Sequence, residues 1–263
     1  IMSIKIATGW SNPGGSTTAH INLCNLFNEN GMECTLYGPH DWHLDKCKGA
    51  MLDTMSVEES DNMIFHYIPV RGEVPARKVV LSVHEKNLMP LKDVDLNSFD
   101  FVHYLTNEQR KWHSVNHPYY IIPNVYDDLK SGNKKEGSKG VAGIIGSVDR
   151  NKQTHVSIKR ALEEGFKKVI LFGRVTETNY FERLVKPLLN EQVVGPSYSE
   201  DKQDMYDSIE AAFLSSESEV APLIKGECFL TGTTFYGNNN TSGGDEPFPK
   251  SQVLEKWKQA LDL

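Results

Sequence analysis

Two glutamates, Glu219 and Glu227, flank the first residues of the apolar segment VAPLIKGECFLTGTTFYGN, 220–238. Ionised carboxylates accept hydrogen bonds from hydroxyl groups, and near the start of a helix they are also favoured by the helix dipole. The pair therefore either belongs to a binding site for a hydroxyl-rich ligand or consists of two solvated residues at a helix start.

Basic residues follow a predicted strand end in GSVDRNKQTHVSI, which begins at Gly146. Lys152 comes where a helix is expected to begin, and its charge could neutralise an anionic group, as could that of Arg150. Either side chain could equally be an ordinary surface cation.

Two glycines and one histidine complete the candidates. Gly14 and Gly15 precede a predicted helix, so they either form a tight turn or let backbone amides approach an anion. His84 closes the predicted strand KVVLSVH, and ligands of open α/β sheets gather at the carboxyl ends of strands. The alternative is a histidine satisfied by a backbone partner.

Short apolar runs alternate with polar segments of helical period, which predicts parallel α/β sheets. The stretch DDLKSGNKKEGSKG, 127–140, is almost free of apolar residues and predicts a solvated connector. We therefore expect two Rossmann-like α/β domains in tandem, at 1–130 and 138–247. The final segment, 248–263, predicts a terminal helix whose apolar stripe docks elsewhere; the stripe consists of Val253, Leu254, Trp257, Ala260 and Leu261.

These motifs resemble glycosyltransferase family 4 over most of the chain. Glu219, Glu227 and the following Gly232-Thr233 fall on the family's pattern of Glu, seven residues, Glu and a Gly-Thr turn. PGGSTTAHINLCNLFNENGMECTLYG resembles its first glycine-rich loop, helix and strand, and YYIIPNV its Ile-Pro-Asn segment. Gly146 and Lys152 match a Gly-Arg strand end with a later Lys, but Ser147 stands where Arg is usual.

The resemblance implies a compact GT-B fold with a short C-terminal domain, in which the second domain binds a nucleotide sugar and the first takes the acceptor. A nucleotide sugar presents a ribose, two phosphates and a sugar in a line. Glu227 would accept hydrogen bonds from the ribose at the first turn of a helix, and Glu219 would face the transferred sugar. Lys152, with Arg150 in place of the missing arginine, would neutralise the departing diphosphate.

Further roles follow from the same resemblance. Gly14, Gly15, Gly146, Gly232 and Thr233 would help to bind the donor, and His84 would lie near the transferred sugar. The implied reaction is sugar transfer from a UDP- or GDP-linked donor to a glycan or lipid-linked acceptor hydroxyl, with retention of the anomeric configuration. It needs no metal or other cofactor.

Composition excludes several other classes. The chain has 263 residues with a formal charge of −7 and no dense basic run, which argues against nucleic-acid binding. No apolar run is long enough to cross a membrane and no secretory signal is visible, so we expect a cytoplasmic protein with free cysteines. Peripheral membrane contact through Lys86, Arg110 and Lys111 is an alternative to a solvated face.

Two alternatives to the transferase stay open. A nucleotide-sugar epimerase on the same scaffold would form epimer or free sugar without an acceptor. A non-catalytic nucleotide- or sugar-binding module would bind without turnover, and the departure at Ser147 and the short chain both favour it.

Overall fold

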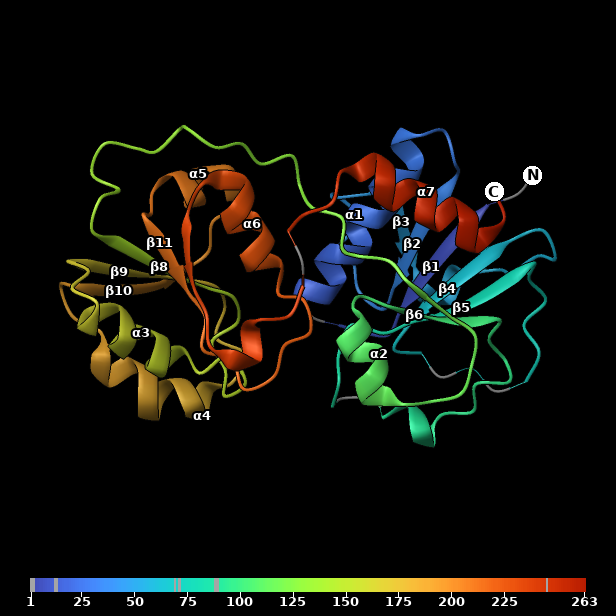
Figure 1. Ribbon diagram of the computed structural model, residues 1–263, viewed down its shortest axis with the longest axis horizontal. Helices are drawn as coiled ribbons and strands as arrows, with labels where there is room; N and C mark the ends of the chain where they lie inside the picture. Colours follow the sequence, from blue (N-terminus) through green and yellow to red (C-terminus); the bar gives the residue numbers. More distant parts are fainter. Residues whose placement is uncertain (1–2, 12–13, 69, 71, 88–89, 245) are drawn as a thin grey trace. The chain divides into compact units, whose positions relative to one another are not determined.

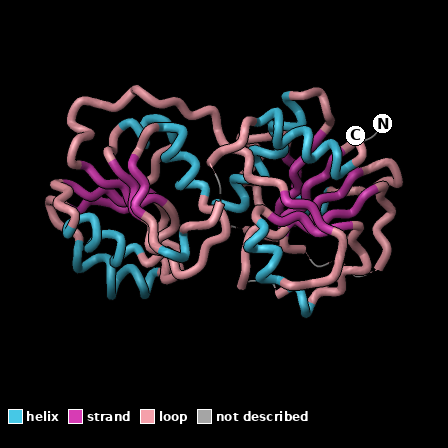
Figure 2. The backbone as a smooth tube through the Cα atoms, viewed as in Figure 1, coloured by secondary structure: helices cyan, strands magenta, loops and turns pink. Residues whose placement is uncertain are grey.

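A computed structural model describes the chain except residues 1–2, 12–13, 69, 71, 88–89 and 245. The chain folds into two compact units, Ile1–Tyr126 with Pro247–Leu263, and Asp127–Glu246. In each unit, helices cover both faces of a parallel sheet (Figures 1 and 2). The predicted fold class, two α/β units with a sheet each, is confirmed.

The first unit is built on a seven-stranded sheet, counted over its described residues, in the order β3-β2-β1-β4-β5-β6-β7. All neighbouring strands pair in parallel. The strands are β1 (Ile4–Thr8), β2 (Cys34–Gly38), β3 (Gly49–Met51), β4 (Asn62–His66), β5 (Lys78–Ser82), β6 (Phe101–Tyr104) and β7 (Tyr119–Ile121). Strand order reverses between β1 and β4, and such a switch point is where open α/β sheets bind ligands.

One face of this sheet carries α1 (Gly15–Glu29) and α7 (Lys250–Leu261), whose apolar sides share a single core (Figure 1). The short α2 (Asn107–His113) follows β6. The stripe predicted for the terminal helix is confirmed, because all five of its residues are buried. Trp257 is the largest of them and packs edge-on against Phe27 of α1.

The second unit has a five-stranded parallel sheet over its described residues, in the order β10-β9-β8-β11-β12. The strands are β8 (Val141–Ile145), β9 (Lys168–Phe172), β10 (Val193–Ser197), β11 (Ala211–Phe213) and β12 (Thr234–Tyr236). Order reverses between β8 and β11, which makes a second switch point. One face of the sheet is covered by α3 (Thr154–Glu163) and α4 (Thr178–Tyr180). The other face is covered by α5 (Lys202–Asp207) and α6 (Leu223–Thr231) (Figure 1).

The predicted connector is held against the second unit. The ammonium group of Lys134 donates to the carbonyl oxygens of Tyr206 and Ile209 and to the hydroxyl of Thr233, at 2.6–2.9 Å. A lysine inside a polar stretch thus anchors that stretch. None of the described helices is both long and apolar enough to cross a bilayer.

Replacing Trp257 by alanine should detach α7 from the core of the first unit. We expect Trp257→Ala to lower the free energy of unfolding by about 3–5 kcal/mol, the cost of emptying a large buried aromatic site. Urea unfolding measures this. Trp112→Ala is the matched control, since Trp112 is 47% exposed; equal effects of the two substitutions would contradict the docking of α7.

Candidate functional site

The carboxyl ends of β8, β9 and β10 are joined to one another directly. Gly146, which follows β8, donates its N–H to the carbonyl of Phe172 at 2.8 Å, and Gly173, which follows β9, donates to Ser197 at 2.8 Å. These bonds align the three loops along the edge of the sheet, beside the switch point. The loops that follow these three strands therefore lie side by side.

Glycine is required at two points of this edge. Gly146 has φ +124°, in the region that favours glycine, and a Cβ placed there would lie 3.8 Å from Cε of Lys152. A Cβ at Gly173 would lie 1.8 Å from the carbonyl oxygen of Gly146. The loop after β9 therefore lies against the loop after β8, and Lys152 lies close to Gly146.

Lys152 and Glu219 form an ion pair between the loops that follow β8 and β11. The Nζ atom of Lys152 donates to Oε1 of Glu219, and the two side chains are 26% and 13% exposed. Lys152 lies in the turn before α3, where its N–H donates to Oδ1 of Asp149 at 2.8 Å. The structure thus brings together two residues whose catalytic roles were predicted from the sequence.

Arg150, the predicted substitute for the missing arginine, pairs with Glu177 and not with Glu219. Its guanidinium lies 3.1 Å from Oε1 of Glu177, and its N–H donates to the other oxygen of that carboxylate. The side chain is 69% exposed. Both cations predicted for the diphosphate therefore have a glutamate partner.

Glu227 does not lie in the first turn of a helix, as expected, but is the fifth residue of α6. The helix begins earlier because Pro222 occupies the N-cap, a position that needs no N–H donor, and Leu223 is the first helical residue. Glu227 is buried, with an exposure of 4%. Its carboxylate therefore projects from the middle of the helix, and the backbone amides of the first turn lie nearer the N-terminus of α6.

Both oxygens of Glu227 have internal partners. Lys202 donates to Oε1 at 2.8 Å and the hydroxyl of Tyr206 donates to Oε2 at 2.6 Å. Lys202 also pairs with Asp127. Burial opposes the charge of Lys202, but the carboxylates of Glu227 and Asp127 outweigh burial and raise its pKa. Because a carboxylate has about four acceptor positions, Glu227 keeps capacity for further donors.

Gly232 and Thr233 lie at the other end of α6. Gly232 ends the helix with φ +67°, and the hydroxyl of Thr233 accepts from Lys134. The next residue, Thr234, bonds to the carbonyl of Glu210 at the start of β11. Both residues therefore belong to the amino edge of the sheet and are not brought together with Lys152 and Glu219.

In the first unit, Gly14 and Gly15 stand at the start of α1 at the carboxyl end of β1. Gly14 is the N-cap in an extended conformation, and its N–H donates to the hydroxyl of Thr17 at 2.6 Å. A Cβ on either glycine would meet no described atom within 4 Å. Neither glycine is therefore required by its φ or by crowding from described atoms.

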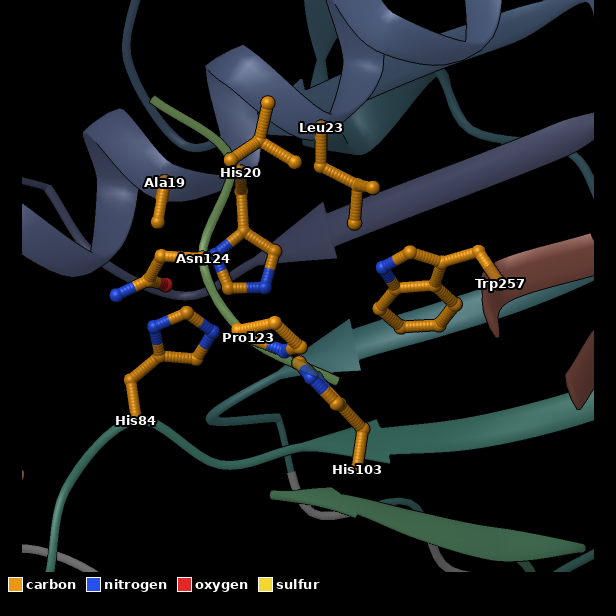
Figure 3. A pocket seen from close by; sticks show the side chains of 9 residues that line it. Ala19, His20, Leu23, His84, His103, Pro123, Asn124 and Trp257 are labelled. Atoms are coloured by element: carbon orange, nitrogen blue, oxygen red, sulfur yellow. The ribbon is translucent and has the colours of Figure 1, made fainter. Parts of the chain in front are cut away.

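His84 belongs to a histidine cluster that the sequence did not predict, formed by His20, His66, His84 and His103. The rings of His20 and His66 stack at 4.1 Å, and that of His84 lies 4.5 Å from His20. A small cavity of about 10 Å³ is lined by three of these histidines and by Trp257 (Figure 3). Within the described residues, no three His, Cys, Asp or Glu side chains form a group that could hold a metal ion.

Hydrogen bonds fix the tautomers of two cluster members. His20 donates from Nδ1 to the carbonyl of Ser16 at 2.7 Å, and His103 donates from Nε2 to Ile122 at 2.8 Å. The hydroxyl of Ser82 lies between their other ring nitrogens. Burial lowers the pKa of His20 to about 4 and of His103 to about 3, and also lowers the pKa of His66 and His84. All four imidazoles are therefore neutral at pH 7.

No protein-family model matches this sequence, and no curated protein matches it significantly. Solved structures do match. Anabaena HepE, solved with UDP and glucose, has a TM-score of 0.67 at 13% identity, over 99% of this chain and 89% of its own. The chain has the GT-B fold.

Two further glycosyltransferases match at similar length. WaaG, which acts in lipopolysaccharide biosynthesis, has a TM-score of 0.65 at 13% identity over 100% of this chain and 91% of its own. Sucrose-phosphate synthase from Thermosynechococcus elongatus has a TM-score of 0.66 at 11% identity, over 99% and 90%. The two-unit architecture is thus shared along nearly the whole of these chains.

The histidine cluster should make the first unit sensitive to acid. The folded histidines have lowered pKa values, whereas unfolded histidines titrate near 6.5, so below that pH only the unfolded chain takes up these protons. Stability is full above pH 6.5 and should fall as the pH decreases towards 5.5. Each histidine contributes up to about 1.4 kcal/mol per pH unit.

Urea unfolding at pH 7.5, 6.5 and 5.5 measures this dependence. His66→Asn should reduce the slope below pH 6.5, while His40→Asn should not, because His40 is exposed. Equal slopes in all three proteins would contradict the contribution of the cluster.

Proposed function

We propose that the protein is a retaining glycosyltransferase that moves a sugar from a nucleoside-diphosphate sugar to an acceptor hydroxyl. The observation that carries the proposal is the pairing of Lys152 with Glu219 at the switch point of the second sheet. A cation and an anion meet there, beside the glycines that follow β8 and β9. The fold shared with glycosyltransferases supports the same conclusion.

In the proposed donor complex, the diphosphate lies against the loops after β8 and β9. Lys152 contacts the diphosphate, and Glu219 is then available to hydrogen-bond the hydroxyls of the transferred sugar. Glu227 accepts from the ribose with its remaining lone pairs. The acceptor, a glycan or lipid-linked alcohol, is taken by the first unit.

The proposed reaction breaks the bond between the anomeric carbon and the diphosphate oxygen. The acceptor oxygen forms its new bond to the same carbon from the same face, and its proton passes to the departing diphosphate. Lys152 stabilises the charge that develops on that diphosphate. No protein base is needed in this sequence of events. The proposal therefore assigns no proton transfer to the histidines of the first unit.

The two alternatives are separated by their products. A transferase forms a glycoside only when an acceptor is present, whereas an epimerase forms epimer or free sugar without one. A binding module does neither. Arg150, the expected substitute for the arginine absent at position 147, pairs with Glu177 instead, and this feature favours the module.

Nucleotide binding tests the donor site without an acceptor. A nucleoside diphosphate, UDP or GDP, at about 100 times its dissociation constant should add about 2.7 kcal/mol to the native state and raise the melting temperature. Glu227→Gln keeps the shape of the side chain and should reduce the shift. Glu163→Gln, on the exposed end of α3, should not. A wild-type protein whose melting temperature no nucleotide raises would contradict the proposal.

Turnover tests the role of Lys152. Lys152→Ala should lower the rate of sugar transfer on the order of 10²-fold, the effect of losing one group that stabilises developing charge. Lys168→Ala provides the control, since Lys168 is exposed at the amino end of β9. The proposed role is wrong if both variants retain the wild-type rate.

Chelation tests whether the reaction needs a metal. We expect the transfer rate after dialysis against EDTA to equal the rate before it, because Lys152 and backbone amides carry the diphosphate charge in the proposal. Rates are measured with and without added Mg²⁺ or Mn²⁺. A rate lost on chelation and restored by either ion would contradict this expectation.

A further inference from the structure

Arg174 is a third cation at the carboxyl edge of the second sheet, and the sequence did not single it out. It follows Gly173 directly after β9. The carbonyl of Arg174 accepts from the N–H of Val148 at 2.8 Å, and Val148 forms a parallel bridge with Val175. Arg174 therefore lies one strand spacing from the loop that contains Ser147.

The guanidinium of Arg174 has no carboxylate partner among the described residues, unlike the cations of Lys152 and Arg150. Lys152 pairs with Glu219 and Arg150 with Glu177. Within the part of the chain that the structure describes, Arg174 forms no ion pair with a carboxylate. An arriving diphosphate must break the Lys152 or Arg150 pair to obtain a full cationic partner from either, but it meets a free guanidinium at Arg174.

The guanidinium of Arg174 is held by an aromatic ring. Its central carbon lies 4.8 Å from the ring centroid of Tyr198, the residue that follows β10. Tyr198 is 55% exposed, so the ring covers one side of the guanidinium without enclosing it. A cation over an exposed aromatic face is held by an attraction of modest strength, which leaves its N–H donors available.

We propose that Arg174, supported by Tyr198, supplies the second cationic contact to the diphosphate of the donor. The inference rests on the proposed function and assigns to Arg174 the role that the sequence suggested for Arg150. Bonds from Gly146 to Phe172 and from Gly173 to Ser197 place Lys152, the two glycines and Arg174 along one row of loops. In this proposal the guanidinium, which follows β9, supplies the cationic contact that the serine at position 147 cannot make. Tyr198 is a positioning residue, because it acts through Arg174.

Calorimetric titration with UDP and GDP tests this assignment. Arg174→Gln should weaken binding of the nucleotide that the wild-type protein prefers by about 10-fold or more, the effect of losing a charge-assisted hydrogen bond. The same variant should reduce the dependence of the affinity on salt, which a purely structural role would not change. Arg174→Lys should keep most of that salt dependence, and Tyr198→Leu should weaken binding less than Arg174→Gln.

Arg150→Gln is the matched control and should bind like wild type, because Arg150 is exposed and paired with Glu177. Normal binding by Arg174→Gln, together with lost binding by Lys152→Gln, would overturn the assignment of Arg174 and leave the donor site intact. Weak binding by Arg150→Gln alone would transfer the role to Arg150. A wild-type protein that binds neither UDP nor GDP would overturn both the donor site and this assignment.

Discussion

When helices cover both faces of a parallel sheet, polar side chains from several strands can meet in the loops at the ends of the strands. Both sheets of this protein are of this kind, and their faces are filled by apolar cores. The ion pair of Lys152 and Glu219 lies in loops at the carboxyl edge, at a point where the strand order reverses. The candidate chemistry of the second unit depends on this constraint, because the loops that follow β8 and β11 meet there.

Charge balance distinguishes the two parts of the candidate site. At the edge of the second sheet, acids neutralise Lys152 and Arg150, and Arg174 rests on an aromatic ring instead. In the helix layer, the burial of Glu227 is compensated by Lys202 and a tyrosine hydroxyl. Buried charges need such partners, so this network is a structural requirement as well as a candidate ribose contact.

Local sequence patterns predicted the elements with strong periodicity. The terminal helix stripe and strands such as KVVLS were clear because burial on one or both faces dictates their residue types. The sequence gives no such signal for strands β3 and β4, since GAM is too short to show a period and NMIFH lacks β-branched enrichment. The segment TNYFERLVKPLLNE is helical from Thr178 to Leu188, but its hydrogen-bond pattern changes from α to π to 3-10, and Pro187 lies in the last turn.

Long-range contacts could not be predicted in this way. The partners of Glu227 lie 25 and 21 residues away, and the histidine cluster collects side chains from four separate segments of the first unit. Arg150 is near Ser147 in the sequence, whereas Arg174 approaches the same loop from a neighbouring strand. Proximity along the chain says little about proximity along the edge of a sheet.

The most direct measurement of the central claim is a map of backbone amide chemical shifts during titration with UDP or GDP. If the diphosphate binds at the switch point of the second sheet, the largest changes will occur at residues 146–152, 173–174 and 219–224. Changes confined to the first unit, around His20 and His84, would contradict the location of the donor site.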